Sequence, residues 1–349
     1  MLERWVEPAG LLHGPAALQA IRDGHALPLA GGPAAFALVR LIENGHDLGI
    51  HSARALPEGW EELLPPLTRR LLPFAGLPTD RPLVMGILNT TPDSFSNGGQ
   101  HLDPAAAIAA GHAMLEAGAD ILDVGGESTR PGADPVTPEE EIARILPVVR
   151  ELAKAAVVSV DTRHPATMRA ALEAGAEIVN DVTGLRQDTQ SMRVVRESRA
   201  PVVLMHMPGL DPRRMQEATH YEDVVLDVAR FLRQRVETAE ALGIPRGRIV
   251  VDPGLGFGKT GAQNLLLLNR LPLLAGIGCR ILVGASRKRF IGRVTGVDLP
   301  AERMAGSLAV ALAAAAGGAS ILRVHDVAAT VQALRMWQAC AEGSAAELD

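Results

Sequence analysis

Cysteine is nearly absent from this chain of 349 residues, which has only Cys279 and Cys340. Two isolated cysteines are too few for a disulfide framework or a thiolate metal site, and they fit a reducing cytoplasm. A basic excess is also lacking, because the net charge is −6 and the pI is near 6.0. Nucleic-acid surfaces normally carry such an excess, so we expect no nucleic-acid partner, although a local anion site remains compatible with the composition.

Segments that would place the chain in a membrane are lacking as well. The first ten residues contain Glu3 and Glu7 and no apolar core behind a basic start, so we expect no signal peptide. One uncharged stretch, residues 304–322, is rich in alanine and is interrupted by Gly317 and Gly318. A spanning helix needs about 20 continuous apolar residues. We therefore interpret this stretch as a buried helix followed by a buried strand.

What the chain does contain is a repeating pattern from residue 83 to residue 341. Eight short apolar runs, each followed by a helical stretch, cover residues 83–89, 121–126, 157–162, 178–183, 201–207, 249–254, 281–286 and 321–326. Such continuously apolar runs are typical of parallel strands that are buried on both faces. The pattern predicts an α/β fold, a (β/α)8 TIM barrel. An open doubly wound sheet would give similar local patterns, but it usually has fewer strands.

Helical patterns separate these runs. We expect helices at 105–119, 139–154, 166–175, 224–243 and 302–318. Pro138 and the acidic residues 139–141 favour a helix start, and Gly175 and Gly243 lie where helix C-caps are common.

Residues 1–80 differ from the barrel domain predicted over residues 81–349, and we treat them as an N-terminal accessory segment of unknown role. They show no strand–helix alternation, and their local patterns predict a short helix at 14–24 and a proline-interrupted helix at 59–72. Four histidines are scattered through the segment without a close pairing to carboxylates: His13, His25, His46 and His51. We interpret them as surface residues rather than metal ligands.

Polar side chains lie at the end of nearly every predicted strand. They are Asn89, Asp123, Asp161, Asn180, Asp252, Lys288, Arg323 and His325. In a TIM barrel the C-terminal ends of the strands meet at one rim, where the active site lies. The sequence therefore predicts one pocket ringed by these side chains, and hence an enzyme.

Two groups of rim residues suggest what the pocket binds. Buried carboxylates need donors, which Lys288 and Arg287 can supply to Asp161 and Asp252. These residues fit either a structural ring of salt bridges or a flat heterocycle with an amide-like edge, and Asn180 favours the heterocycle. Arg323 and His325 project to the same side of the last strand, beside a helix start, where barrels often bind phosphate. Together with Asn89 and the cations after strand seven, they predict a diphosphate site.

Two loops carry further candidates. Loop one, residues 89–99, and loop two, residues 125–133, are rich in Gly, Pro, Ser and Thr, and loops of this make-up can close over a bound molecule. Plain turn chemistry explains Gly and Pro, but it explains Glu127, Thr129 and Arg130 less readily. A third segment, GLGFGKT (254–260), is similar to a nucleotide phosphate loop. That loop needs four residues before Gly-Lys-Thr and only three are present, so we reject an ATPase.

Taken in order, these segments resemble the dihydropteroate synthase family, a pterin-binding TIM-barrel family. The matching segments are ILNTTPDSFSNGG (87–99), DVGGESTRPGA (123–133), SVDT (159–162), NDVTG (180–184), LMHM (204–207), DPGLGFGKT (252–260), GASRK (284–288) and RVHDV (323–327). The resemblance implies a transferase of folate biosynthesis that joins 6-hydroxymethyl-7,8-dihydropterin diphosphate to 4-aminobenzoate. Diphosphate would leave first, giving a pterin methylene cation that the arylamine attacks. It also implies Mg²⁺ as cofactor and a homodimer.

The resemblance also implies residue roles. Pterin binding falls to Asp161, Asn180, Asp252 and Lys288, with Met205 and Phe257 as pocket walls and Gly284 and Ser286 among the other substrate contacts. Asn89, Arg323 and His325 would hold the diphosphate, Asn89 with the metal, and Thr129, Arg130 and Ser286 would shape the aminobenzoate site. The expected catalytic set is Asn89, Thr129, Arg130, Lys288, Arg323 and His325.

One residue departs from the family pattern. Loop one has Asn97 where the family usually has aspartate. If that carboxylate binds metal or shields the cation, Asp93 must replace it or turnover must be slower. A pterin-binding protein without turnover is therefore an alternative. A pterin-dependent methyltransferase is another, but it explains neither the two loops nor the segment RVHD.

Overall fold

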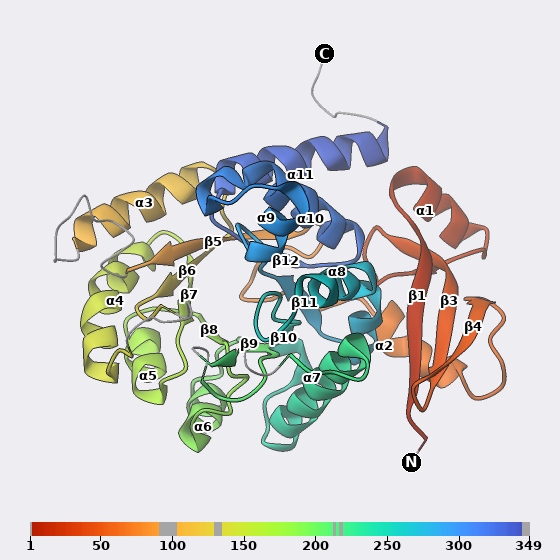
Figure 1. Cartoon of the computed structure of the whole chain (residues 1–349), viewed down its shortest axis with the longest axis horizontal. Helices are drawn as coiled ribbons and strands as arrows, with labels where there is room; N and C mark the ends of the chain where they lie inside the picture. Colours follow the sequence, from red (N-terminus) through yellow and green to blue (C-terminus); the bar gives the residue numbers. More distant parts are fainter. Residues whose placement is uncertain (1, 91–102, 129–134, 212–213, 216–218, 344–349) are drawn as a thin grey trace.

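The computed structural model describes residues 2–90, 103–128, 135–211, 214–215 and 219–343 (Figure 1). Eight parallel strands form a closed barrel: β5 (Leu83–Asn89), β6 (Ile121–Gly125), β7 (Val157–Asp161), β8 (Ile178–Asp181), β9 (Val202–Met205), β10 (Ile249–Asp252), β11 (Arg280–Val283) and β12 (Ile321–Val324). Each strand overlaps its predicted run, and β12 pairs with β5 to close the ring. The predicted TIM barrel is confirmed, and the open sheet is excluded.

Helices surround the barrel. They are α3 (Pro104–Glu116), α4 (Pro138–Leu152), α5 (Pro165–Glu173), α6 (Thr189–Ser198), α7 (Val224–Ala241), α8 (Gly261–Asn269), α9 (Arg289–Thr295), α10 (Met304–Ala316) and α11 (Val327–Glu342), with short 3₁₀ turns η4 (Arg246–Arg248), η5 (Leu271–Ile277) and η6 (Pro300–Glu302). The five predicted helices correspond to α3, α4, α5, α7 and α10. The uncharged stretch at 304–322 divides into α10 and the start of β12, as expected. In the described ranges, no helix is both long enough and apolar enough to cross a bilayer.

Local signals account for the helix ends. The hydroxyl of Thr137 accepts a hydrogen bond from the backbone of Glu140, and the Glu140 side chain accepts one from the Thr137 backbone, so a capping box starts α4. Gly175 and Gly243 follow α5 and α7 with φ values of 111° and 91°, a conformation that glycine adopts without steric cost.

Apolar side chains from the strands fill the barrel interior. The cluster comprises Leu83, Met85, Ile121, Ile178, Val203, Val250, Leu282 and Ile321, together with Phe74. Phe74 precedes β5 and is only 1% exposed, so the segment that leads into the barrel packs against the interior residues at the starts of the strands. The domain boundary near residue 80 stays a prediction.

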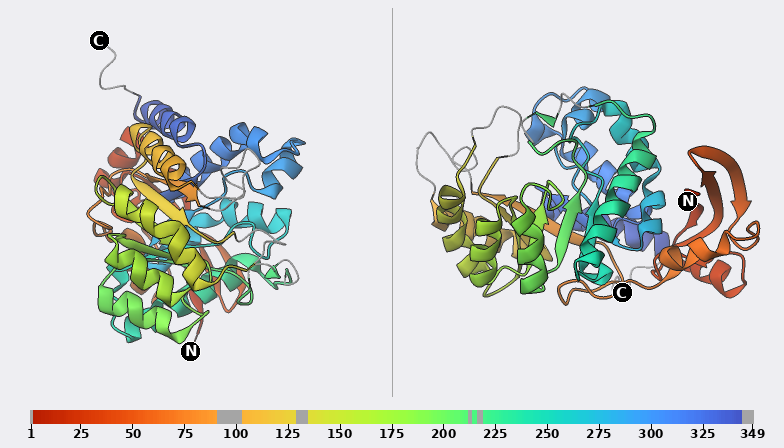
Figure 2. Two further views of the ribbon diagram at one scale, coloured as in Figure 1. Left: turned by 90° about the vertical axis from the view of Figure 1, so that its left-hand side faces the viewer. Right: turned by 90° about the horizontal axis from the view of Figure 1, so that it is seen from below.

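The N-terminal segment forms an antiparallel sheet that the sequence analysis did not anticipate. It contains β1 (Arg4–Leu12), β2 (Leu27–Pro28), β3 (Ala35–Glu43) and β4 (His46–Ser52), and β3 pairs with each of the others. The predicted helix at 14–24 is present as α1 (Gly14–Arg22). Only η1 (Glu61–Leu63) and α2 (Leu64–Thr68) form within the helix predicted at 59–72. The right-hand view of Figure 2 shows that this sheet stands beside the ring of barrel helices.

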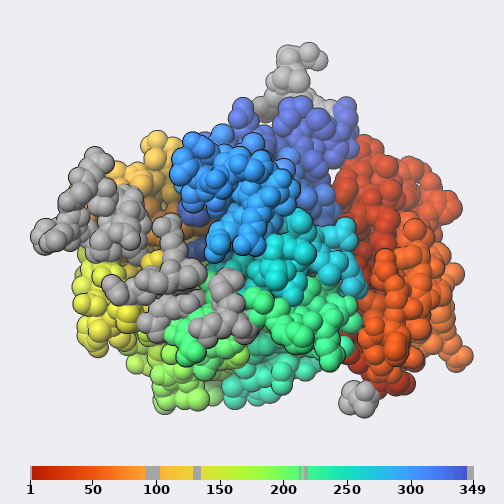
Figure 3. All heavy atoms as spheres, in the orientation of Figure 1, coloured from red at the N-terminus to blue at the C-terminus, as the bar shows by residue number. Residues whose placement is uncertain are grey.

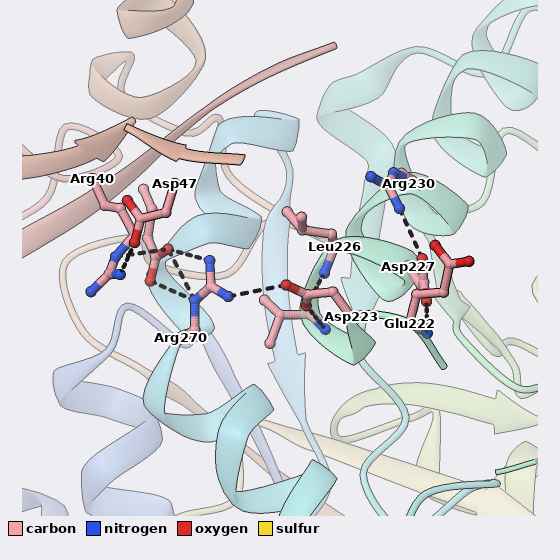
Figure 4. Close-up of polar contacts among 10 residues, drawn as sticks. Arg40, Asp47, Glu222, Asp223, Leu226, Asp227, Arg230 and Arg270 are labelled. Carbon is pink, nitrogen blue, oxygen red and sulfur yellow. Dashed lines mark hydrogen bonds and ion pairs between the residues drawn. The ribbon is translucent and has the colours of Figure 1, made fainter. Parts of the chain in front are cut away.

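The sheet is joined to the barrel by apolar packing and by ion pairs. Trp5 is buried, and the Arg233 guanidinium of α7 lies 3.2 Å from the centre of its ring. Glu3 pairs with Arg230 at 2.7 Å, and Glu7 pairs with Arg270 at 2.7 Å. Figure 4 shows Arg230 and Arg270 at this junction, and Figure 3 shows the N-terminal residues lying directly against the barrel. The segment is therefore packed onto the barrel.

The N-terminal histidines do not gather at one place. His25 and His46 are exposed, whereas His13 packs edge-on against Trp337 of α11, with 5.5 Å between the ring centres. Within the part of the chain that the structure describes, no group of three or more His, Cys, Asp or Glu side chains is arranged to hold a metal ion.

Candidate active site

The register of the barrel places four rim positions in one layer. Asn89 of β5 pairs with Gly125 of β6, Gly125 with Asp161 of β7, and Asp161 with Asn180 of β8. A Cβ atom built on Gly125 would lie 3.4 Å from Asp161 Cβ and 3.7 Å from Asn89 Oδ1. The glycine thus leaves the space between these two side chains open. The strands therefore carry an amide, a carboxylate and a second amide around one mouth.

Arg323 spans this mouth from β12. Its Nε donates to Asp123 Oδ2 at 2.6 Å, and its Nη2 donates to Asp161 Oδ2 at 2.6 Å. Asn180 Nδ2 donates to the same Asp123 oxygen at 3.0 Å. Gly284 lies beside the arginine, since a Cβ atom there would lie 3.7 Å from Arg323 Cβ, at ordinary van der Waals contact. Side chains from β12, β6, β7 and β8 thus meet in one hydrogen-bonded network. Closure of the barrel brings these strands together.

Asp123 is central to the network, although the sequence analysis gave it no specific role. It is fully buried, and its Oδ1 has no hydrogen-bond partner among the residues that the structure describes. A buried carboxylate oxygen without a donor is unfavourable unless a ligand supplies one. The signal was its place two residues before the end of β6, because alternate residues of a strand face the same side.

The other carboxylates of the mouth are shifted toward their neutral forms. Burial raises the pKa of Asp161, the Arg323 guanidinium opposes that rise, and Asp123 adds to it. Burial likewise raises the pKa of Asp252, which accepts a hydrogen bond from the backbone N–H of Gly254 at 2.7 Å. Carboxylates held in this way favour ligands with positive charge or N–H donors.

Lys288 supplies positive charge on the other side of the pocket. Its Nζ lies 4.1 Å from the centre of the Phe257 ring. Burial lowers its pKa to about 8, while Asp252 acts in the opposite direction. Phe257 in turn packs on an apolar cluster that contains Met205, so a flat apolar wall lies next to the lysine. Arg287, expected to serve the carboxylates, instead pairs with Asp326 at 2.5 Å.

His325 lies near the cationic side chains of Arg287, Arg323 and Lys288. Its Nδ1 is 3.1 Å from Ser286 Oγ, and its backbone N–H donates to the same oxygen at 3.2 Å. Burial, with the nearby guanidinium groups of Arg287 and Arg323, lowers the pKa of His325 to about 4. The imidazole is therefore neutral near pH 7 and can donate one hydrogen bond without adding charge.

The rim residues expected from the sequence thus lie at one end of the barrel. Asn89, Asp161, Asn180, Asp252, Lys288, Arg323 and His325 belong to strand ends or to the residues that follow them. Thr129, Arg130, Asp93 and Asn97 lie outside the described residues, so their roles rest on the sequence. The mouth combines acceptors for N–H groups, an aromatic wall and a cationic edge.

Comparisons with known proteins agree with this chemistry. The sequence model of the family described as pterin binding enzyme matches residues 85–325. The chain is 49% identical over 264 residues to a dihydropteroate synthase of Neisseria meningitidis serogroup C, covering 74% of this chain and 93% of that protein. It is 46% identical over 265 residues to a dihydropteroate synthase of Escherichia coli K12, covering 75% and 93%.

Solved structures give the same result. The dihydropteroate synthase of Xanthomonas albilineans with 4-aminobenzoic acid is 54% identical, with a TM-score of 0.72, covering 76% of this chain and 94% of that one. The same enzyme in complex with 7,8-dihydropteroate is 51% identical, with a TM-score of 0.69, covering 76% and 95%.

Proposed function

This chain belongs to the dihydropteroate synthase family of pterin binding enzymes, and from that membership we propose how its own residues carry out the reaction. The reaction condenses 6-hydroxymethyl-7,8-dihydropterin diphosphate with 4-aminobenzoate, and it yields 7,8-dihydropteroate and diphosphate for folate biosynthesis. The observation that carries the proposal is the contact of Arg323 with Asp161. It brings the residue proposed to bind the diphosphate next to a residue proposed to bind the pterin ring.

The pterin ring would lie among the buried polar groups of the rim. Asp161 and Asp252 would accept hydrogen bonds from its amino and ring N–H groups, and the Asn180 amide can both donate and accept. The free Oδ1 of Asp123 offers one more acceptor. Lys288 would donate to the ring carbonyl. Met205 and Phe257 would form the wall, because flat rings favour aromatic and thioether contacts.

The diphosphate would lie at the edge formed by β12 and β5. The contacts of Arg323 with its two carboxylates use Nε and one N–H of Nη2, which leaves donors on Nη1 and Nη2 for phosphate oxygens. The neutral His325 ring and Ser286 would add hydrogen bonds. Gly284 leaves the backbone open to close approach. Arg323 and Lys288 would thereby stabilise the negative charge that develops on the leaving group.

The cofactor proposal is Mg²⁺ held by Asn89 and by the substrate's own phosphate oxygens. The amide oxygen of Asn89 is a ligand type that Mg²⁺ accepts, and Mg²⁺ is usually held by few protein ligands together with phosphates. Bound there, it would neutralise charge on the departing diphosphate. The single protein ligand is compatible with the lack of a dense ligand cluster in the described ranges.

In the chemical step the bond between the pterin methylene carbon and the diphosphate oxygen breaks, and diphosphate departs with the electron pair. The carboxylates of Asp161, Asp252 and Asp123 would stabilise the positive charge left on the pterin. The amine nitrogen of 4-aminobenzoate then bonds to the methylene carbon and releases a proton. Thr129 and Arg130 are proposed with Ser286 to shape the aminobenzoate site.

Assembly and location are also proposals. Large exposed apolar side chains occur between the start of α9 and the end of α11, namely Val294, Leu299, Met304 and Met336, which supports the proposal of a homodimer. Sedimentation of the purified protein tests it. Cys279 and Cys340 are both free, which supports a reducing cytoplasm as the location, and cell fractionation tests that proposal.

The function is tested by incubating purified protein with both substrates and Mg²⁺. We expect 7,8-dihydropteroate and diphosphate in equal amounts, and neither when one substrate is omitted. Replacing Asp161 with alanine is expected to raise the KM for the pterin substrate by about ten- to a hundredfold, because a hydrogen bond to a charged group is lost. If no product forms while a known synthase is active in parallel, the proposal fails. In that event tight pterin binding, with activity restored by Asn97→Asp, would identify a binding protein that has lost turnover.

A further inference from the structure

The segment GLGFGKT, rejected above as a nucleotide-binding loop, contains a lysine that the proposed mechanism does not use. Lys259 ends the loop between β10 and α8, and it is only 4% exposed. In a nucleotide-binding loop the lysine would reach outward to phosphates. Here the side chain turns inward instead, and its ammonium group is enclosed by the protein.

The Lys259 ammonium has four neutral acceptors at hydrogen-bond distance, three of them at 2.9 Å and the carbonyl oxygen of His206 at 3.4 Å. Its Nζ lies 2.9 Å from the carbonyl oxygen of Gly254, 2.9 Å from that of Phe257 and 2.9 Å from His206 Nδ1. Burial lowers the pKa of Lys259 to about 7, and in the charged form its three N–H donors are satisfied by the three short contacts when Nδ1 of His206 carries a lone pair. Burial and the Lys259 charge keep the pKa of His206 well below its usual value, which favours that neutral form.

These contacts join the ends of two neighbouring strands. His206 directly follows Met205 at the end of β9, whereas Gly254 and Phe257 lie in the loop after β10. One of the carbonyl oxygens that accept from Lys259 belongs to Phe257, whose ring is proposed to form a wall of the pterin pocket. One buried side chain thus links the end of β9, which carries Met205, to the loop that carries Phe257.

Lys259 acts together with other contacts of the loop: the N–H groups of Gly254 and Gly256 donate to Asp252 and Asn264, and Tyr221 donates to the carbonyl of Gly258. Gly254, Gly256 and Gly258 all have positive φ, at 64°, 81° and 60°. A Cβ atom on Gly254 would lie 2.0 Å from the carbonyl oxygen of His206, and one on Gly256 would lie 2.9 Å from Lys288 Cδ. Only glycine fits these positions, but glycine leaves the backbone free in the unfolded chain. A set of strong hydrogen bonds is needed to define one conformation.

The loop conformation in turn places the lysine that faces the substrate. Gly256 leaves room for the Lys288 side chain, which a Cβ atom there would approach to 2.9 Å, and the Phe257 ring lies under the Lys288 ammonium. A displaced loop would shift both the ring and the lysine.

We propose that Lys259 is a positioning residue for pterin binding, which acts through Phe257 and Lys288 without touching the substrate. The proposal rests on the proposed function for the identity of the ligand. It predicts a selective effect, because the contacts of Lys259 all lie on the side of the pocket assigned to the pterin ring.

The test compares Lys259→Met, which keeps side-chain length but removes all three donors, with Lys259→Gln, whose amide keeps two donors. We expect Lys259→Met to raise the KM for the pterin diphosphate about tenfold, and Lys259→Gln to have a smaller effect in the same direction. The KM for 4-aminobenzoate should stay within about twofold of the unmodified protein. Lys154→Met is the matched control, because Lys154 is exposed and pairs only with Glu151 in the described ranges.

Two outcomes would overturn the proposal. One is a folded Lys259→Met protein with an unchanged pterin KM. The other is a loss of activity toward both substrates that matches the loss of folded protein, as a merely structural role would give. If the unmodified protein makes no product, the proposed function fails by itself. The pterin affinity of the same variants, measured by fluorescence titration, then judges Lys259 separately.

A second measurement uses the unmodified protein, so it does not depend on whether a variant folds. The chain has only three lysines, Lys154, Lys259 and Lys288, so lysine-selective ¹³C and ¹⁵N labelling gives three sets of NMR signals. We expect the Nζ protons of Lys259 to exchange most slowly. We also expect its signals to move with those of Lys288 when 6-hydroxymethylpterin is added. The proposal would be contradicted if the Nζ protons of Lys259 exchanged as fast as those of Lys154 and its signals did not shift on addition of the pterin.

Discussion

Arginines contact pairs of carboxylates both at the barrel mouth and at the junction with the N-terminal sheet, and these two places differ in their access to water. At the barrel mouth Arg323 contacts Asp123 and Asp161, whose side chains are 0% and 15% exposed. At the junction with the N-terminal sheet, Arg230 contacts Glu3 and Asp227, which are 26% and 29% exposed. The pairing chemistry is alike, but the desolvation of the charges is not.

The difference in exposure indicates that the ion pairs at the mouth and those at the junction have different roles. Charges removed from water are expensive, and a buried cluster with more carboxylates than cations is a weak basis for stability. Such a cluster is better suited to a ligand that brings N–H donors. A half-exposed pair contributes little, but it orients two surfaces that apolar packing already joins. We therefore expect changes at the mouth to affect both stability and turnover, and changes at the junction to affect stability alone.

The largest effect should come from Arg323→Met. It leaves two buried carboxylates without their cation, so the free energy of unfolding should fall by about 3–5 kcal/mol, and turnover should be lost. Urea denaturation and the product assay measure the two. A variant as stable as the parent would show that the mouth tolerates unpaired carboxylates, and the comparison would break.

A smaller effect concerns the pH dependence of Lys288. Its pKa in the folded protein, about 8, is below its usual value of 10.5, so the unfolded chain binds more protons between these pH values. Stability from this group therefore rises with pH through that window. Pterin binding should change in the opposite sense, because the ammonium donor is lost as pH rises through about 8. The pterin KM should increase about tenfold from pH 7 to pH 9.

Lys288→Met supplies the control for that profile. It should already bind pterin weakly at pH 7, and its KM should vary little over the same range. A profile that is equally steep in the variant would assign the titration to another group.

At the junction, Arg270→Met tests an intermediate case. Its partner Glu7 is only 9% exposed and would keep only the longer contact with Arg40, at 3.9 Å, so loss of the arginine should lower the free energy of unfolding by about 1–3 kcal/mol. Neither residue contacts the rim, so kcat and KM should not change. An altered KM would show that the N-terminal sheet communicates with the mouth.

The smallest effect is expected for Arg230→Met. The pair with Glu3 is partly exposed, and its loss should lower stability by about 0.2–1 kcal/mol, less in high salt. Thermal unfolding at two salt concentrations measures this. A loss as large as that of Arg323→Met would remove the distinction between the two places.

The barrel could be predicted because its signals are local. Each strand is a short apolar run between helical patterns, so eight repeats specify the ring before any contact is known. The N-terminal sheet could not be predicted in this way. β1 contains Pro8 and Gly10, which normally interrupt strands, and β1 tolerates Pro8 because it pairs only with β3. α8 was also missed, because its run of leucines does not show the periodic spacing of polar residues that marks a helix with one polar face.

The rim residues could be named from the sequence, but their partners could not. Which carboxylate meets Arg323 depends on how the barrel closes, and Asp123 therefore received no role. Arg287 was expected to serve the pocket, yet it pairs instead with Asp326, which lies 39 residues further along the chain. The inward turn of Lys259 depends on three glycine conformations, which residue types alone do not specify.

The central claim is that the ring site and the diphosphate site share one mouth. Competition calorimetry tests it most directly, with 6-hydroxymethylpterin and inorganic diphosphate each titrated against the joined substrate in the presence of Mg²⁺ but without 4-aminobenzoate. We predict that each half displaces the whole molecule and binds more weakly than it does. If either half binds without displacing the joined substrate, the two sites are separate and the account is wrong.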